Sequence, residues 1–329
     1  MMRRRLILAL TAFAALGLAV VALMLSRHPA APAVARAPES ALGAFIVPAV
    51  PAEREKALRP EIIEALGLGA VSSPWNRRLD LIRKQSADLT AVEAEALLAA
   101  LMEQCPPTVS AAIHSTYMHE IACILQLRGD IRERFARALA TLARDPARDE
   151  ATRDYAIQHL RQVWSRAAGD PALRTAIVAT FREFTRLDPV LATPSLLSLH
   201  LLGSPAGESS TGRGPRAGAQ SAATVFSLPD SDLAPLLQPI FAAKTSTQNM
   251  PARLTAMRIV GERRLTGFRQ SLLTALRDRS EHALVRMAAA NALGKIADPA
   301  DLATLASLDP GDARVAAALR HALRPAANR

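Results

Sequence analysis

The sequence predicts an all-α protein whose helices form hairpins that stack side by side into an α-solenoid. Half of the residues are hydrophobic and 4% are aromatic, and the apolar content is mainly Ala and Leu, which favour helix and let helices approach closely. The segment 286–294 repeats the segment 253–261 at a distance of 33 residues, with Arg, a small residue and a late Gly in the same places. No stretch combines alternating β-branched residues with hairpin turns. Such an internal repeat indicates stacked helical hairpins.

The chain begins with a basic segment followed by a strongly apolar one. Residues 1–5 include three arginines, and Leu6–Leu25 carries no charge, with Thr11 as its only polar residue. Twenty residues at about 1.5 Å each span about 30 Å, which matches the hydrocarbon core of a membrane. We therefore expect residues 6–25 to form a single transmembrane helix behind a cytoplasmic segment of residues 1–5.

A cleaved signal peptide is the alternative interpretation of this segment. Its apolar region is longer than that of most signal peptides, but the small residues at 33–35 offer a cleavage site after Ala35. More arginines precede the apolar segment than follow it, which places the N-terminus in the cytoplasm. We expect a single-pass inner-membrane protein whose body faces the periplasm or exterior, or, after cleavage, a secreted periplasmic protein.

Residues 26–60 contain six prolines among many alanines, a composition that resists helix and favours extended backbone. We expect them to form a semi-rigid spacer between the membrane and the body.

The body begins with an N-terminal helical segment, residues 61–148. Thr90-x-x-Glu93 reads as a capping box, Asp130 reads as the N-cap of a later helix, and Ser73 followed by Pro74 reads as the start of another. Expected helices in this segment lie near 61–66, 75–82, 90–104, 112–127 and 130–142.

Residues 149–324 are expected to hold the repeats. A Gly, Ser and Pro-rich loop at 204–221 interrupts them, because it has no periodic apolar pattern. Asp170 caps one helix and Thr193-Pro194 begins another. The last helix has no partner and would close the core. Expected helices lie near 152–160, 171–184, 193–203, 232–243, 250–261, 267–276, 284–296, 299–308 and 313–324.

Arg153, Arg253 and Arg286 share one position of the repeat. An Arg in a stacked array usually reaches a carbonyl or an Asp in the neighbouring turn, so we expect a structural role. A surface for an acidic partner is the alternative. The small residues of the same repeats are expected where helices touch, at Ala156, Ala256 and Ala289.

The segments Arg153–Gly169, Met250–Leu276 and particularly Val285–Asp298 resemble HEAT repeats, including the HEAT-like repeats of phycobilisome lyases. The resemblance covers about residues 149–324 and implies an α-solenoid that binds other proteins. As a whole the chain resembles bacterial membrane-anchored envelope proteins with such repeats and no assigned activity. The resemblance implies no catalytic residue.

Cys105 and Cys123 are the only cysteines. An exported domain would favour a disulfide. If Cys105 lies at a turn and Cys123 about ten residues into the next helix, however, they are about 15 Å apart, beyond the limit of about 7 Å for bridged Cα atoms. We expect two buried thiols, with the disulfide as the alternative.

His114, His119 and Glu120 lie in one predicted helix. Side chains five residues apart diverge by about 140° on a helix, so we expect no shared metal ion. The serines lie in caps and in the loop, and no phosphate-binding glycine motif follows a strand. We therefore expect no catalytic, cofactor-binding or metal-binding residue and no cofactor. The remaining histidines of the body do not share a repeat position and are interpreted as incidental: His159, His200, His282 and His321.

The net charge of +10 invites a nucleic-acid function, but the arginines are scattered and form no basic tract. We expect a non-catalytic, membrane-anchored scaffold or adaptor in the cell envelope that binds a protein partner of unknown identity. No nucleic acid and no small-molecule substrate are expected. The alternatives are an enzyme of the HEAT-like lyase type and a basic nucleic-acid-binding module.

Overall fold

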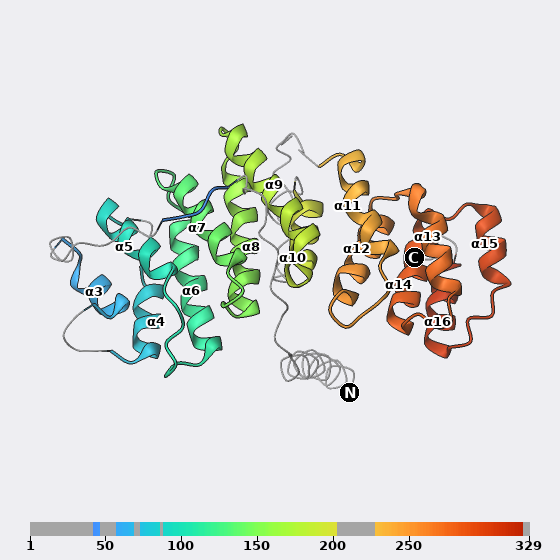
Figure 1. Ribbon diagram of the computed structural model, residues 1–329, viewed down its shortest axis with the longest axis horizontal. Helices are drawn as coiled ribbons and strands as arrows, with labels where there is room; N and C mark the ends of the chain where they lie inside the picture. The colour runs from blue at the N-terminus through green and yellow to red at the C-terminus, as the bar shows by residue number, and fades with distance from the viewer. Residues whose placement is uncertain (1–41, 47–56, 69–72, 86–87, 203–227, 325–329) are drawn as a thin grey trace, which may run out of the picture. The chain divides into compact units, whose positions relative to one another are not determined.

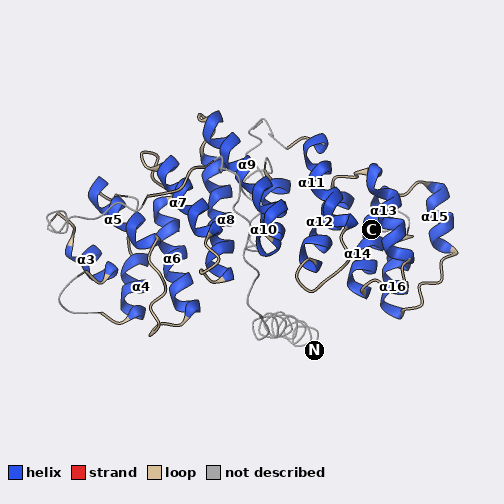
Figure 2. Ribbon diagram, viewed as in Figure 1, coloured by secondary structure: helices blue, strands red, loops and turns tan. Residues whose placement is uncertain are grey.

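The computed structural model describes residues 42–46, 57–68, 73–85, 88–202 and 228–324. Every regular element within these ranges is a helix, as the sequence predicts (Figure 2). Within them, no helix is both long and apolar enough to cross a membrane. The predicted membrane segment 6–25 and the predicted loop 204–221 lie outside the described residues.

The helices follow one another in hairpins along the chain (Figure 1). A short 3-10 helix, η1 (Thr266–Phe268), precedes α13. The α-helices are α3 (Pro60–Leu66), α4 (Trp75–Arg83), α5 (Ala91–Leu101), α6 (Ala111–Leu125), α7 (Arg132–Arg144), α8 (Glu150–Arg166), α9 (Pro171–Leu187), α10 (Pro189–Leu201), α11 (Asp230–Ala242), α12 (Met250–Glu262), α13 (Arg269–Arg277), α14 (Ala283–Ile296), α15 (Pro299–Ala306) and α16 (Ala313–Ala322).

The hairpins stack through contacts between helices that are two places apart along the chain. The even-numbered helices contact one another in sequence from α4 to α16, and odd-numbered neighbours such as α5, α7 and α9 do the same. This packing makes two layers, which is the arrangement of an α-solenoid. It begins at α3, so the segment 61–148 follows the same pattern as the predicted repeats.

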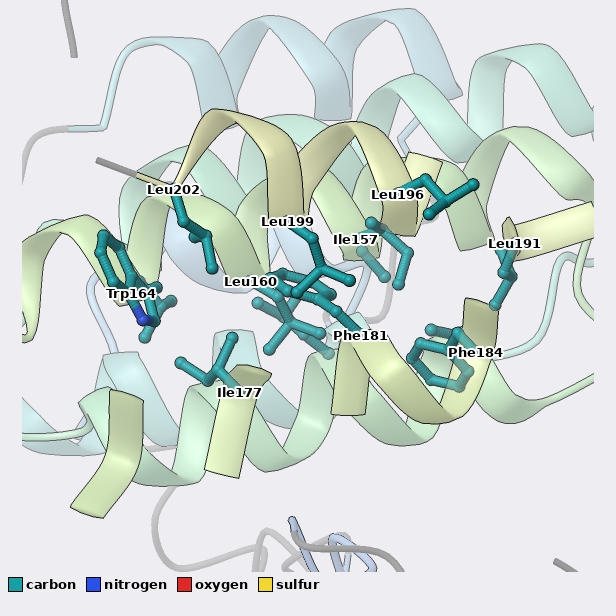
Figure 3. Packing of buried hydrophobic residues seen from close by; sticks show 14 of the residues in the cluster. Ile157, Leu160, Trp164, Ile177, Phe181, Phe184, Leu191, Leu196, Leu199 and Leu202 are labelled. Atoms are coloured by element: carbon teal, nitrogen blue, oxygen red, sulfur yellow. The ribbon is translucent and has the colours of Figure 1, made fainter. Parts of the chain in front are cut away.

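The core lies between the two layers. In its central part, Ile157 and Leu160 of α8 face Ile177 and Phe181 of α9, while Leu199 of α10 packs over them (Figure 3). Each of these side chains is fully buried. A buried aliphatic or aromatic side chain contributes about 1.5–3 kcal/mol, so this continuous apolar seam holds successive hairpins together.

Two of the predicted helix starts are confirmed. The Thr90 side chain accepts a hydrogen bond from the Glu93 amide at 3.2 Å, and the Glu93 carboxylate accepts one from the Thr90 amide at 2.8 Å, completing the capping box. Asp170 accepts from the Leu173 amide at 2.9 Å at the start of α9. Each cap satisfies an amide that the first turn leaves unpaired.

Two predicted caps, Ser73 and Asp130, were wrong because another side chain binds each of them, and one predicted helix start was wrong. The Ser73 hydroxyl donates to Glu64, and α4 begins after Pro74 instead. The Asp130 carboxylate binds both ends of the Arg128 guanidinium, so α7 begins after Ile131 without a side-chain cap. The third helix, α10, begins earlier at Pro189, because Asp188 caps it, and Pro194 lies inside the helix.

The predicted spacer does not extend through all of residues 26–60. Leu42 is 3% exposed, and its main-chain oxygen accepts from Arg144 of α7. The Phe45 amide donates to the Thr141 hydroxyl of the same helix at 3.0 Å. Leu58 is also buried, just before α3 begins. Residues 42–46 and 57–60 are therefore part of the folded body.

Candidate functional site

The three arginines predicted to be structural close the ends of the preceding helices. Arg153 donates to the Ala143 carbonyl at 2.8 Å and Arg286 to the Leu276 carbonyl at 3.0 Å, in each case ten residues back at the end of the previous helix. Arg253 makes the same bond at 2.6 Å, to the carbonyl that directly follows α11. These carbonyls have no partner within their own helices, so the guanidinium groups satisfy them.

Each of these arginines also reaches the next hairpin. Arg153 forms an ion pair with Asp188, and Arg253 forms one with Glu281 at 3.0 Å. Arg286 donates a hydrogen bond to the Pro310 carbonyl at 2.7 Å. The three side chains are 5–6% exposed. They hold hairpins together and do not form a surface for an acidic partner.

In α4 and α6 the fourth residue of the helix, which is the position of these arginines, is also a buried polar residue. The sequence analysis did not predict either of these two residues. Arg78 is the fourth residue of α4, as Arg286 is of α14, and it donates to the carbonyls of Ala65 and Leu66 at the end of α3. His114 is the fourth residue of α6 and is 2% exposed. Both residues could have been found from the sequence, because each is a polar residue in the first turn of the second helix of its hairpin.

Two glycines let the C-terminal even helices approach closely. A Cβ on Gly261 would lie 3.0 Å from the Cα of Ala292, and a Cβ on Gly294 would lie 2.7 Å from the Cβ of Ala322. The first distance is tighter than most real side-chain contacts and the second is shorter than real ones, so α12, α14 and α16 approach closely at these points.

A groove of about 510 Å³ runs over these three helices. Small residues form its floor and longer polar side chains form its rim. The floor is lined by Gly261, Ala288, Ala292 and Ala322, and the rim by Arg258, Glu262, Asn291, Lys295 and His321. Three of the rim residues also share a repeat position, since Asn291 follows Arg258 by 33 residues and His321 follows Asn291 by 30.

The rim carries an excess of positive charge. Its one carboxylate, on Glu262, lies 3.8 Å from the Arg258 guanidinium and accepts a hydrogen bond from His200 at 2.9 Å. Burial and the nearby Arg263 lower the pKa of His200. Arg258 and Lys295 therefore outnumber the single acid, and this part of the solenoid surface is suited to a negatively charged ligand.

The two cysteines are separate thiols as expected, but each is only partly buried, so the expectation of buried thiols was wrong. The Cys105 thiol lies 3.6 Å from the main-chain oxygens of Pro106 and Val109, and the Cys123 thiol lies 3.6 Å from a ring nitrogen of His119. Burial raises the pKa of both thiols. Neither is activated as a nucleophile, because the thiolate is the reactive form.

His114, His119 and Glu120 all lie on α6, but their side chains point to different neighbours. His114 packs edge-on against the Trp75 ring at 5.8 Å between centroids, and Glu120 pairs with Arg83 at 2.9 Å. His119 instead faces α8. The divergence expected from the spacing of His114 and His119 is confirmed.

His159, interpreted above as incidental, lies against His119, a contact that the sequence did not predict. Its Nε2 is 3.0 Å from Nδ1 of His119, and burial together with His119 lowers the pKa of His159 to about 3. His119, Cys123 and His159 each offer a ligand atom within 4.8 Å of the others, so they could hold a metal ion. Spacing within one helix could not reveal the group, because the third residue comes from a neighbouring hairpin. The other histidines lie apart: His200 beside Glu262, His282 at the start of α14 and His321 on the groove rim.

Comparison with known proteins identifies the C-terminal repeats. Residues 237–324 match the family model for HEAT repeats, a range that reaches from the second half of α11 to just beyond α16 and contains the groove. No curated protein and no solved structure matches the chain. The match and the stacked hairpins of this region together support a HEAT-repeat protein.

Proposed function

We propose that this protein is a non-catalytic scaffold or adaptor that binds an acidic segment of another protein in the groove over α12, α14 and α16. The groove carries the proposal, because it lies within the residues that match HEAT repeats. HEAT repeats are in general protein-interaction modules, and stacked hairpins offer extended surfaces for this purpose.

The chemistry of the groove favours such a partner. Its floor of Gly and Ala accepts small apolar side chains of a bound segment, while Arg258 and Lys295 on the rim attract carboxylates. Complementary charge of this kind speeds encounter and sets the register of binding more than it adds affinity.

We further propose that the chain is anchored in the inner membrane by residues 6–25, with its body in the periplasm or exterior. The support is the length of the apolar segment and the arginines of residues 1–5 that precede it. Cleavage after Ala35 and release into the periplasm is the alternative.

Site-specific photo-crosslinking in intact cells tests the partner-binding proposal. A photoreactive residue at Asn291, which is exposed in the groove, should capture a specific acidic protein, whereas one at the exposed Thr274 of α13 should not. The charge reversals Arg258→Glu and Lys295→Glu together should weaken binding of that protein about tenfold. The matched reversal Arg277→Glu, on the odd-helix layer, should leave binding unchanged. Equal capture at both positions, or equal loss in both variants, would refute the proposal.

Reporter fusions test the topology. A reporter that is active only outside the cytoplasm, fused after Arg329, should be active, and the fusion should remain with the membrane fraction. Activity of a cytoplasm-only reporter instead would refute the proposed topology, and quantitative release as a soluble periplasmic protein would favour cleavage after Ala35.

A further inference from the structure

His119, Cys123 and His159 form a side-chain cluster that the scaffold function does not use. His119 and Cys123 are four residues apart on α6 and therefore lie on one face of that helix. His159 projects from α8, which packs directly against α6. Because both helices are held by the core, the three side chains are brought together before any ligand arrives.

A neighbouring amide sets the protonation of His159. Nδ1 of His159 lies 3.3 Å from the side-chain oxygen of Gln126, an oxygen that can only accept a hydrogen bond. Nδ1 therefore carries the ring proton, and the lone pair of Nε2 points at His119, 3.0 Å away. Histidines that bind metals are typically oriented in this way, by an acceptor on the other ring nitrogen.

The remaining contacts hold the cluster in a partly buried, largely apolar place. The His119 ring packs against the Tyr155 ring at 4.6 Å between centroids, and His159 is 4% exposed. Leu101 and Leu139 line the small cavity beside the two histidines. Such a shell limits access of water and holds the imidazole rings in place.

We propose that His119, Cys123 and His159 bind one thiophilic d10 metal ion, Zn²⁺ or Cu⁺. Two imidazoles and one thiolate suit these ions, whereas Mg²⁺ and Ca²⁺ prefer oxygen ligands, and the nearby Glu120 is turned toward Arg83. Zinc bonds of about 2.0–2.1 Å to nitrogen and about 2.3 Å to sulfur need side-chain shifts on the order of 1 Å from the present positions.

Metal binding releases a proton from this cluster. The Cys123 thiol loses its proton to solvent as the sulfur bonds to the ion, and each imidazole stays neutral with one ring proton. One proton is thus released for each ion bound. With three protein ligands, Zn²⁺ would take a water as its fourth ligand, whereas Cu⁺ is satisfied by three donors. The ion would join α6 to α8, two successive hairpins of the solenoid.

The test uses the full chain, purified in detergent and without thiol reductants, and titrated with Zn²⁺, with Co²⁺ as its spectroscopic substitute, and with Cu⁺ under anaerobic conditions. We expect one ion per chain, a higher Tm, and a thiolate-to-metal charge-transfer band with Co²⁺. Tight binding of Zn²⁺ together with the Co²⁺ band identifies zinc, and tight binding of Cu⁺ alone identifies copper.

The variants separate this site from adventitious binding. Cys123→Ser and His159→Gln should lower affinity at least about a hundredfold, and Gln126→Ala about tenfold. Cys105→Ser, which removes the other thiol, should bind like the unmodified chain. Circular dichroism without metal checks that each variant is folded. The proposal would be overturned if Zn²⁺ and Cu⁺ both bound the unmodified chain no more tightly than they bind Cys123→Ser. It would also be overturned if Cys105→Ser lost as much affinity as Cys123→Ser.

Discussion

The Arg286 side chain donates from Nε to the main-chain oxygen of Leu276 at 3.0 Å. This bond joins the first turn of α14 to the last turn of α13, and the same guanidinium donates to the Pro310 carbonyl at 2.7 Å in the turn before α16. One buried side chain therefore connects two consecutive hairpins. The recurrence of the bond at Arg153 and Arg253 makes it a structural unit of the solenoid.

Replacing Arg286 should destabilise the fold. In Arg286→Ala the Leu276 and Pro310 carbonyls lose their partner, and we expect the free energy of unfolding to fall by about 2–4 kcal/mol, because bonds to a charged group are worth about 1.5–3 kcal/mol each. Arg286→Lys should recover only part of the loss, since Lys cannot reach both carbonyls with a planar fork. Urea unfolding measures both. The exposed Arg320→Ala on α16 is the control and should change stability by less than about 0.5 kcal/mol.

Gly294→Ala should also be destabilising, although Ala is the better helix former by about 1 kcal/mol. The added Cβ would lie 2.9 Å from the main-chain oxygen of Ala322, so α14 and α16 must move apart at a cost of about 1–3 kcal/mol. Thermal unfolding followed by circular dichroism measures the change. In Gly267→Ala nothing lies within 4 Å of the new Cβ, so that variant should be neutral or slightly more stable. An equal or higher Tm for Gly294→Ala would contradict the close contact.

Stability should depend on the charge of Glu93, whose side chain is 0% exposed. Burial by itself raises the pKa of this carboxyl, but hydrogen bonds from the Arg59 side chain, at 2.6 Å, and from the Thr90 and Arg59 amides lower it below its usual value overall. The resulting stabilisation is complete above the ordinary Glu pKa of about 4.3 and is lost as the pH falls through the lowered pKa of the folded state.

Glu93→Gln should therefore lower the Tm by about 2–6 °C at pH 7, and the difference from the unmodified chain should shrink below about pH 4. Thermal unfolding across this range measures it. The matched variant Glu133→Gln alters an acid that is 60% exposed and should show little effect at either pH. A constant Tm difference for Glu93→Gln from pH 7 to pH 3 would contradict the role of the charge.

Local signals in the sequence predicted most of the helices, since capping and apolar periodicity depend on residues within one or two turns. Thr90 and Asp170 cap their helices as expected. Ser73 and Asp130 do not, because Glu64 and Arg128 bind them first. The sequence does not show which of several possible partners a capping side chain will bind.

The sequence alone predicted that the described chain is helical, that its last hairpins repeat, and that the arginines of the repeats have a structural role, with a surface for an acidic partner as the alternative. Each of these follows from spacing along the chain. Only the tertiary structure decided that Gly294 lies on Ala322, that Arg258 and Lys295 share a groove, and that His159 lies on His119. These pairs come from different helices, and the packing of side chains between the two layers, which no spacing within one helix encodes, brings them together.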